Sequence, residues 1–446
     1  MQPKPETIAA IATAPGRGGI GVVRISGANL QVFAEAVCGR APQPRLATLA
    51  KFLDRQNQVL DEGIVLYFPA PNSYTGEDVV ELQGHGGPAV LQSILQRCLE
   101  LGARMAEPGE FTKRAYLNGK MDLTQAESVA DLIDATTTQA ARSAVRSLQG
   151  DFSTAIHALV KKLVHLRMLA EAMLDFPEEE LDVDDIALRR QKIEELQKEL
   201  AHIFSVAQQG CLLREGAHVV LVGQPNVGKS SLLNRLSGDE VAIVSDIPGT
   251  TRDVIRQAIQ LNGVPLHLID TAGLRESDDT VEKIGIDRTR KTVQQADAIL
   301  LLVDATQGIT AEDRAILETL PPQIPLIRVY NKIDLIGHAA EGHPDSDAYD
   351  IYLSARTGAG IELLQQRLLQ LIGWHQEAGV FMARERHLHA LRSAQESIAL
   401  AEQELARPEC CAEELRRAQE MLNTITGEFT PDDLLGEIFK NFCIGK

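Results

Sequence analysis

The sequence has no apolar run long enough to cross a membrane. Its longest apolar stretches, such as Ala298–Val303, fall far short of the roughly 18 residues that a spanning helix requires. The first residues are polar and lack the apolar core of a secretory signal, so we expect a cytoplasmic protein without a membrane segment. Aromatic residues make up only 4% of the chain, which leaves little material for a base-stacking platform.

Basic side chains are in the minority, with 44 Lys and Arg against 62 Asp and Glu. The formal net charge of −18 argues against indiscriminate nucleic-acid binding, although a local basic patch stays compatible with it. The six cysteines include no C-x-x-C pair, and no histidine lies at zinc-finger spacing from them. We therefore interpret them as reduced thiols, and the residues after Cys443 fit a prenylation motif poorly.

The 446 residues are too many for a single hydrophobic core, and three kinds of sequence pattern divide them. Residues 1–118 combine short β-like runs with Gly and Pro, which predicts a small α/β domain. Residues 119–215 and 374–446 carry apolar side chains at helical spacing, which predicts one helical domain in two parts. Residues 216–373 alternate between strands and helices. We therefore predict a multi-domain α/β plus α protein in which this unit is inserted into the helical domain.

A phosphate-binding motif opens the inserted unit. The β-branched strand His218–Val222 precedes Gly223-Gln-Pro-Asn-Val-Gly-Lys-Ser230, which matches G-x-x-x-x-G-K-S and runs into a predicted helix. The glycines let backbone amides converge on phosphate, Lys229 suits the β- and γ-phosphates, and the Ser230 hydroxyl suits Mg²⁺. The predicted nucleotide-binding residues here are Asn226, Val227, Gly228, Lys229, Ser230 and Ser231.

Three further elements follow in the order of a Ras-like P-loop GTPase. Asp270-Thr-Ala-Gly273 supplies a carboxylate for the metal's water and an amide for the γ-phosphate. In Asn331-Lys-Ile-Asp334 the last carboxylate can accept from two ring N–H donors of guanine, a pair that adenine lacks. We predict GTP binding by Asp270, Thr271, Ala272, Gly273, Asn331, Lys332, Asp334, Ser354 and Ala355.

The dipeptide Asn262-Gly263 between two β-like runs predicts a hairpin, and with it one antiparallel edge on an otherwise parallel sheet. A second glycine motif, Gly16-Arg-Gly-Gly-Ile-Gly21, matches the dinucleotide fingerprint G-x-G-x-x-G. That fingerprint must open a helix, whereas here it runs into the strand-like Val22–Ile25. We therefore predict no dinucleotide site in this chain.

The residue that orients the attacking water is not evident from the GTPase motifs. Leu274 stands where Ras carries its water-orienting glutamine, and a hydrophobic side chain cannot orient water. The motifs alone leave several candidates open, namely Arg275, Glu276, Asp278, Asp279 and Glu282, with Arg252 or Arg275 as a cis arginine.

Four blocks outside the GTPase motifs are distinctive, namely Gly16–Gly27, Pro71–Pro88, Pro108–Glu127 and Cys443-Ile-Gly-Lys446. The GTPase motifs resemble those of the group that includes Era, Der and MnmE, and these blocks are similar to the MnmE (TrmE) family of tRNA uridine modification GTPases. The likeness spans the chain. The resemblance implies GTP hydrolysis coupled to addition of a carboxymethylaminomethyl or aminomethyl group to C5 of the wobble uridine, position 34, of certain tRNAs. It also implies an N-terminal folate-binding domain that delivers a one-carbon unit from 5-formyl- or 5,10-methylenetetrahydrofolate.

The resemblance further assigns residues. It places K⁺ on Asn226, Ser245, Ile247 and Thr250, Mg²⁺ on Ser230 and Thr251, and the water-orienting role on Glu282. It adds the switch segment Ser245, Asp246, Ile247, Pro248, Gly249, Thr250 and Thr251 to the GTP-binding residues. Folate contacts fall on Arg24, Glu81, Lys120 and Lys446, while Cys443 matches a cysteine needed for modification but not for GTP hydrolysis.

The resemblance implies a homodimer and a flavoprotein partner, MnmG (GidA), which alone carries FAD, in a heterotetramer or larger complex that acts on tRNA. Two alternatives share the GTPase motifs. One is a ribosome-assembly GTPase of the Era or Der kind, although residues 376–446 contain no KH-type G-x-x-G loop. The other is a self-assembling mechanochemical GTPase.

Overall fold

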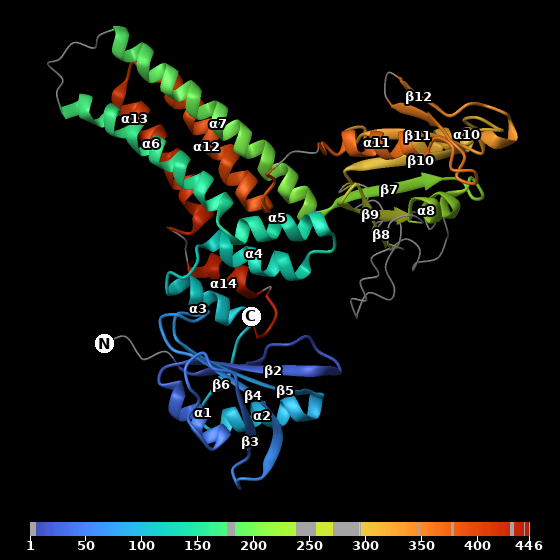
Figure 1. Ribbon diagram of the computed structural model, residues 1–446. Helices are drawn as coiled ribbons and strands as arrows, with labels where there is room; N and C mark the ends of the chain where they lie inside the picture. The colour runs from blue at the N-terminus through green and yellow to red at the C-terminus, as the bar shows by residue number, and fades with distance from the viewer. Residues whose placement is uncertain are drawn as a thin grey trace, which may run out of the picture. The chain divides into compact units, whose positions relative to one another are not determined.

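The computed structural model of the protein describes residues 6–175, 183–237, 256–270, 294, 296–345, 348–375, 379–428, 432–440 and 442–445 (Figure 1). The chain separates into two compact units. The first comprises residues 1–130, 147–193 and 396–446, and the second comprises residues 131–146 and 194–395. The division into three domains at residues 118, 215 and 373 stays a prediction. None of the described helices is long and apolar enough to cross a membrane.

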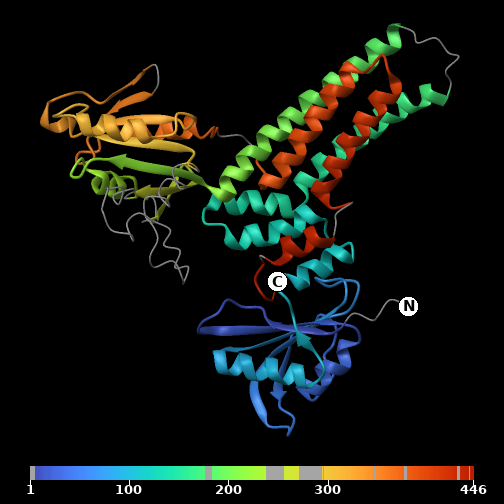
Figure 2. The ribbon, with the colours of Figure 1, turned by 180° about the vertical axis from the view of Figure 1, so that it is seen from behind.

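A six-stranded sheet forms the N-terminal part of the first unit, in the order β3-β4-β5-β2-β1-β6. All neighbours pair antiparallel except β1 and β6, which pair parallel. Helices α1 and α2 cover one face of the sheet, as both views of the ribbon show (Figures 1 and 2). The bounds are β1 (Ile8–Ile11), β2 (Gly18–Gly27), α1 (Leu30–Cys38), β3 (Thr48–Leu53), β4 (Val59–Phe68), β5 (Asp78–Gly86), α2 (Pro88–Glu100) and β6 (Arg104–Met105).

The glycine-rich segment after Gly16 is a strand and not the turn of a dinucleotide fold, as predicted. Strand β2 already begins at Gly18 and pairs with β5. Its Gly21 lies so close to α2 that a Cβ there would approach the Leu91 side chain to 2.6 Å. The glycine therefore serves helix–sheet packing, because no larger residue leaves room for α2.

Long helices make up the rest of the first unit. Helices α6 and α13 pack side by side, and the Arg167 guanidinium donates to the Gln419 side-chain oxygen at 2.7 Å. The start of α4 packs on α14 through Leu123 and Phe439. The bounds are α3 (Glu110–Leu117), α4 (Leu123–Asp134), α5 (Thr138–Leu148), α6 (Asp151–Asp175), α7 (Val183–Glu215), α12 (Glu385–Gln403), α13 (Pro408–Thr426) and α14 (Asp432–Lys440), of which α4, α5, α7 and α12 have residues in both units.

One predicted helix was wrong in extent. The apolar spacing over residues 412–442 predicts a single helix, but α13 ends at Thr426 and α14 begins at Asp432. Gly427 follows α13 with a φ of 87°, the left-handed conformation that commonly ends a helix, and its amide still bonds the Asn423 carbonyl. A helical repeat that continues on both sides of such a cap does not reveal the break.

A buried carboxylate links α3 to the sheet. The Glu110 side chain, only 10% exposed, accepts hydrogen bonds from Arg104 at 2.6 Å and from Arg114 at 2.9 Å. Burial of this carboxyl raises its pKa, but the bonds from Arg104, the Glu107 amide and Arg114 outweigh burial and lower the pKa to about 2. The ionised form is therefore the one that stabilises the fold.

We expect Glu110→Gln to destabilise the first unit at pH 7 by on the order of 3 kcal/mol, since the folded pKa lies well below the ordinary value. A lowered folded pKa gives stability that is complete above the unfolded pKa and is lost as the pH falls towards 2. The difference between wild type and variant should therefore shrink by about half at pH 3. Urea unfolding at both pH values measures it, with the exposed Glu107→Gln as control; a difference independent of pH would contradict the assignment.

A seven-stranded sheet forms the core of the second unit, in the order β12-β13-β11-β10-β7-β9-β8. Its five inner strands run parallel and carry helices on both faces, so β10 is buried almost throughout. The bounds are β7 (Ala217–Gly223), α8 (Lys229–Ser237), β8 (Arg256–Leu261), β9 (Val264–Asp270), β10 (Ala298–Asp304), α10 (Ala311–Thr319), β11 (Leu326–Asn331), the 3-10 turn η1 (Ile333–Leu335), β12 (Glu341–Pro344), β13 (Tyr349–Tyr352) and α11 (Ile361–Leu371).

The predicted hairpin is present, but the sheet has two antiparallel edges instead of one. Leu261 pairs with Val264, and Asn262 and Gly263 have φ values of 49° and 84°, which is the geometry of a two-residue turn with both central residues left-handed. The second edge is β12, which pairs antiparallel with β13. Its sequence, Glu-Gly-His-Pro, lacks the β-branched alternation from which a strand is predicted.

Candidate guanine-nucleotide site and N-terminal charged pair

The phosphate-binding loop joins the end of β7 to α8, as predicted. Three of its residues, Gly223, Asn226 and Gly228, have φ values of 142°, 64° and 101°. A Cβ on Gly223 would approach the Leu302 carbonyl to 2.5 Å, so the loop lies directly on the neighbouring strand β10. The Lys229 ammonium donates to the Gly223 and Gln224 carbonyls at 2.6 and 3.0 Å, which places its charge over the loop.

Asn331 connects the phosphate loop to the base-recognition loops. Its side-chain amide donates to the Val227 carbonyl at 2.8 Å, and its side-chain oxygen accepts from the Ala355 amide at 2.9 Å. The residue is 3% exposed, and a Cβ on Gly228 would meet its amide nitrogen at 2.2 Å. Asn331 therefore holds three segments in register, and only glycine at 228 leaves room for it.

Asp334 is oriented by a hydroxyl from the next loop. Ser354, fully buried, donates to the Asp334 carboxylate at 2.7 Å and accepts from the Thr357 amide at 3.2 Å. Arg235 of α8 donates to the Ala355 and Arg356 carbonyls, which ties the same loop to the helix after the phosphate loop. The predicted guanine-binding residues are thus brought together by hydrogen bonds between distant segments.

Lys332 is paired with a residue that the motifs did not single out. Its ammonium lies 2.6 Å from the carboxylate of Asp304, the last residue of β10. Burial raises the pKa of the Asp304 carboxyl, but hydrogen bonds from Lys332 and Thr306 outweigh it and hold the pKa below its ordinary range. Its position at the carboxyl end of a buried parallel strand, where such sheets bind ligands, is the signal that could have found it.

Only part of the predicted Mg²⁺ site lies among the described residues. Asp270, the last residue of β9, is paired in register with Leu221 of β7, so it lies at the same edge of the sheet as the phosphate loop. Ser230 stands exposed in the first turn of α8. The backbone thus brings Asp270 and Ser230, the residues predicted for Mg²⁺ and its water, to the same edge of the sheet. The following predicted residues lie outside the described residues: Ser245, Asp246, Ile247, Pro248, Gly249, Thr250, Thr251, Arg252, Thr271, Ala272, Gly273, Leu274, Arg275, Glu276, Asp278, Asp279 and Glu282.

Arg24 and Glu81 form an ion pair on neighbouring strands of the N-terminal sheet. The two residues are paired in register between β2 and β5, and the guanidinium lies 3.0 Å from the carboxylate. The guanidinium carbon also lies 5.4 Å from the Tyr74 ring and 5.8 Å from the Phe111 ring. Phe111 is fully buried, so the cation, the acceptor and the half-buried Tyr74 ring are the groups that fit a flat heterocycle with donors and oxygens. The two rings were missed from sequence, although Tyr74 and Phe111 each lie within one of the family blocks.

Two other predicted residues lie near this pair. Lys120 donates to the Pro71 carbonyl at 3.2 Å and lies against Gly76, so it borders the loop that carries Tyr74. The C-terminal segment reaches the same sheet, because the Cys443 carbonyl accepts from the Gly109 amide at 3.2 Å and Gly445 lies against the Ile11 carbonyl. Ile11 pairs with the residue before Arg24. Lys446 itself lies outside the described residues.

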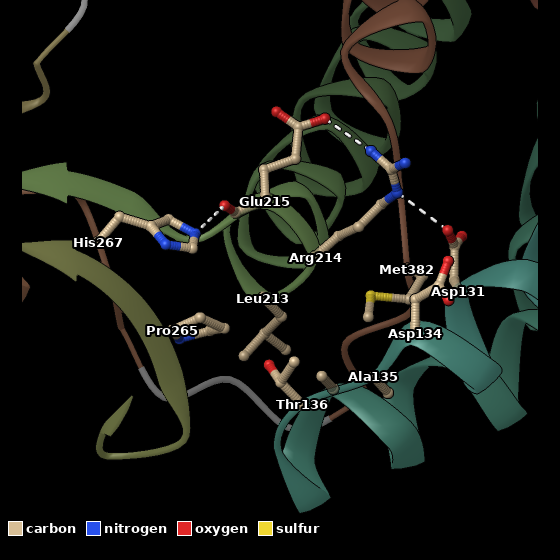
Figure 3. A pocket seen from close by; sticks show the side chains of 11 residues that line it. Asp131, Asp134, Ala135, Thr136, Leu213, Arg214, Glu215, Pro265, His267 and Met382 are labelled. Carbon is tan, nitrogen blue, oxygen red and sulfur yellow. Dashed lines mark hydrogen bonds and ion pairs between the residues drawn. The ribbon is translucent and has the colours of Figure 1, made fainter. Parts of the chain in front are cut away.

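The buried carboxylate of Asp131 connects distant segments of the second unit. Asp131, 6% exposed, accepts from Arg214 near the end of α7 at 2.9 Å and from Arg384 just before α12 at 2.8 Å. Figure 3 shows Arg214 between Asp131 and Glu215 at the wall of a hollow of about 410 Å³. On the opposite wall the His267 ring of β9 lies 3.1 Å from the Glu215 carbonyl. Asp131 thus connects the end of α7 to the residue before α12.

Two models of known protein families match this chain, and together they cover nearly all of it. The family model of the GTP-binding protein TrmE N-terminus matches residues 7–120, and that of the MnmE helical domain matches residues 123–443, well over half of the chain. The chain belongs to the MnmE family. The tRNA modification GTPase MnmE of Dechloromonas aromatica (strain RCB) is 61% identical over 99% of this chain and 100% of the relative. The protein of the same name from Nitrosomonas eutropha (strain DSM 101675 / C91 / Nm57) is 59% identical over 99% of each chain.

Membership of the MnmE family makes the protein a GTP hydrolase, with GTP and Mg²⁺ as its nucleotide and metal. The fold class predicted from sequence is confirmed, and the Era- or Der-like alternative gives way to the MnmE assignment. Among solved structures, an Era variant from Aquifex aeolicus bound to GDP and aluminium fluoride is 28% identical. It covers 41% of this chain and 67% of its own, with a TM-score of 0.29, which carries no argument about function.

Proposed function

We propose that this MnmE-family GTPase drives modification of C5 of the wobble uridine, position 34, in a set of tRNAs. The added carboxymethylaminomethyl or aminomethyl group would take its one-carbon unit from 5-formyl- or 5,10-methylenetetrahydrofolate. The observation that supports this most is the charged pair Arg24–Glu81 with the neighbouring Tyr74 ring, beside the C-terminal segment that carries Cys443. The work would take place in the cytoplasm.

The N-terminal site offers complementary groups to a reduced folate. Glu81 would accept from the N–H donors of the pterin, while Arg24, Lys120 and Lys446 would meet the carbonyl and glutamyl oxygens. Without a ligand, Arg24 and Glu81 compensate each other's charge through their ion pair. A bound ligand would replace this contact with contacts of its own to the two side chains. Cys443 is exposed and its backbone is bonded to the N-terminal domain, so its thiol would belong to the same region.

The nucleotide site would hydrolyse GTP with help from K⁺. A bound K⁺ would supply positive charge where other GTPases use an arginine. Asn226 is exposed at the turn of the phosphate loop, and its side chain would hold the ion together with Ser245, Ile247 and Thr250. Glu282 would orient the attacking water, since Leu274 cannot do so.

We propose that the protein works as a homodimer and with the flavoprotein MnmG (GidA), which carries the FAD. Exposed apolar side chains on the N-terminal sheet support the proposed pairing. Leu49 of β3 and Ile64 of β4 are opposed in register and are 62% and 39% exposed. Exposed apolar side chains opposed on two neighbouring strands are typical of a surface that another chain covers.

Replacing Arg24 by Gln tests the folate assignment. We expect the variant to lose reduced-folate binding by tenfold or more, on the order of one charge-assisted hydrogen bond, and to leave uridine 34 undermodified. Calorimetry with 5-formyltetrahydrofolate and mass spectrometry of tRNA from a complemented deletion strain measure the two effects. Arg55→Gln, an exposed arginine in the turn between β3 and β4, is the matched control. Normal uridine-34 modification in the deletion strain itself would overturn the proposed function.

A further inference from the structure

A groove of about 430 Å³ lies in the second unit where α5 meets the turn between β8 and β9. Gln139, Arg142, Ser143 and Arg146 line it from α5, and Gln260 and Asn262 line it from the hairpin. No residue of its lining is acidic, and every one of them belongs to the described part of the chain. The groove is distinct from the nucleotide site and from the Arg24–Glu81 pair.

The positive charge of this groove contrasts with the rest of the chain. Arg142 and Arg146 are exposed and four residues apart, so their guanidinium groups project from one face of α5. Residues 135–150 include these two arginines and no acidic side chain, whereas the whole protein carries a formal net charge of −18. A groove lined by two exposed arginines and by no acidic residue suits an anionic ligand.

The neutral groups of the groove suit a sugar-phosphate backbone. Gln139, Gln260 and Asn262 offer amide donors and acceptors beside the two guanidinium groups. Arginine pairs with phosphate through two parallel N–H donors, while amides and hydroxyls commonly bind phosphate oxygens and sugar hydroxyls. The groove is open at its surface, and its two arginines follow one another along α5. This arrangement fits the successive phosphates of a nucleic-acid strand better than a single free phosphate, which would be enclosed.

We propose that this groove binds the phosphate backbone of the tRNA substrate. The inference deepens the proposed function, on which it rests, by assigning an RNA contact to named residues of this chain. Phosphate contacts of this kind position an RNA without reading its sequence. The contact would therefore be common to all the tRNAs that the protein serves.

The wall of the groove is continuous with the GTPase sheet. The buried Thr137 hydroxyl donates to the Gly263 carbonyl at 2.9 Å, and a Cβ on Gly263 would meet the Gln139 side chain at 2.5 Å. Strand β9 starts directly after this turn and ends at Asp270, at the edge of the sheet that holds the phosphate loop. RNA in the groove would contact both α5 and the hairpin that leads to the nucleotide site.

The test is tRNA binding by the full-length protein, measured by fluorescence anisotropy across a series of KCl concentrations. We expect R142Q/R146Q to bind tRNA on the order of tenfold more weakly, and the slope of log K against log [salt] to fall by about two. Arg314→Gln is the matched control, since this exposed arginine lies on α10 among acidic residues. GTP hydrolysis measured in parallel shows that the variants are folded.

Two outcomes would overturn the inference. One is wild-type affinity and an unchanged salt slope in R142Q/R146Q; the other is an equal loss in Arg314→Gln. Competition distinguishes the sources of phosphate, because millimolar inorganic phosphate should displace tRNA no better than sulfate at equal ionic strength. Displacement by inorganic phosphate alone would indicate a free-phosphate site instead. Normal uridine-34 modification by a variant with normal tRNA binding would leave the proposed function in place and reject only the groove.

Discussion

Replacing Asp334 by Asn should weaken GTP binding by about 10²- to 10⁴-fold, because two charge-assisted hydrogen bonds to the guanine edge are lost. The same change should favour xanthosine triphosphate, whose ring carries a carbonyl in place of the exocyclic amine of guanine and can accept from the new amide. The side chain should keep its place, since an amide oxygen can still accept from the Ser354 hydroxyl that now bonds the carboxylate at 2.7 Å. Binding of fluorescent analogues of both nucleotides measures the change.

The control for this result is Ser354→Ala, which removes the orienting hydroxyl and leaves the carboxylate. It should weaken both nucleotides by a smaller and similar factor, because the hydroxyl contacts Asp334 and a backbone amide. Asp334→Asn with wild-type affinity for GTP would contradict the assignment of Asp334 to the base. A loss of both nucleotides would instead indicate a misfolded loop.

The second large effect concerns the cation. We expect GTP hydrolysis to be at least tenfold faster in potassium than in sodium buffer at matched ionic strength, and Asn226→Ala to lose that difference. Asn226 has a φ of 64°, which alanine adopts with strain of about 1 kcal/mol, so the backbone must be tested separately. Asn226→Gly provides that control, because glycine adopts this conformation freely and also lacks the side-chain oxygen.

Both variants should lose potassium stimulation if the side chain holds the ion. Stimulation that persists in Asn226→Gly and is lost only in Asn226→Ala would show a backbone effect and reject Asn226 as a ligand. Equal rates of the wild type in the two salts would return the catalytic assignment to Arg252 and Arg275.

The sequence predicted the parts of the site that local chemistry determines. The phosphate loop lies between a buried strand and a helix because its glycines permit left-handed backbone and the neighbouring run is β-branched. The turn at Asn262-Gly263 and the strand that follows Gly16 were predicted on the same kind of local grounds. In each case two or three adjacent residues are sufficient to select one conformation.

The contacts that unite the site could not be predicted in this way. Asn331 bonds Val227 and Ala355, and nothing near any of the three in sequence specifies the other two. The end of α13 at Thr426 is accompanied by packing of Gly427 against Tyr116 and Leu123, which are far away in sequence, and the short edge strand β12 has no β-branched alternation. The association of the C-terminal segment with the N-terminal sheet came only from the family resemblance.

The carboxylate of Asp131 has a consequence for how the inserted part is attached. Residues 216–383 leave the helices after Glu215 and return at Arg384, and arginines next to both crossings bond the same oxygen atom. The two ends of the predicted insert therefore lie side by side. Since the two crossings are held side by side, another domain with adjacent termini could be grafted in place of the predicted insert.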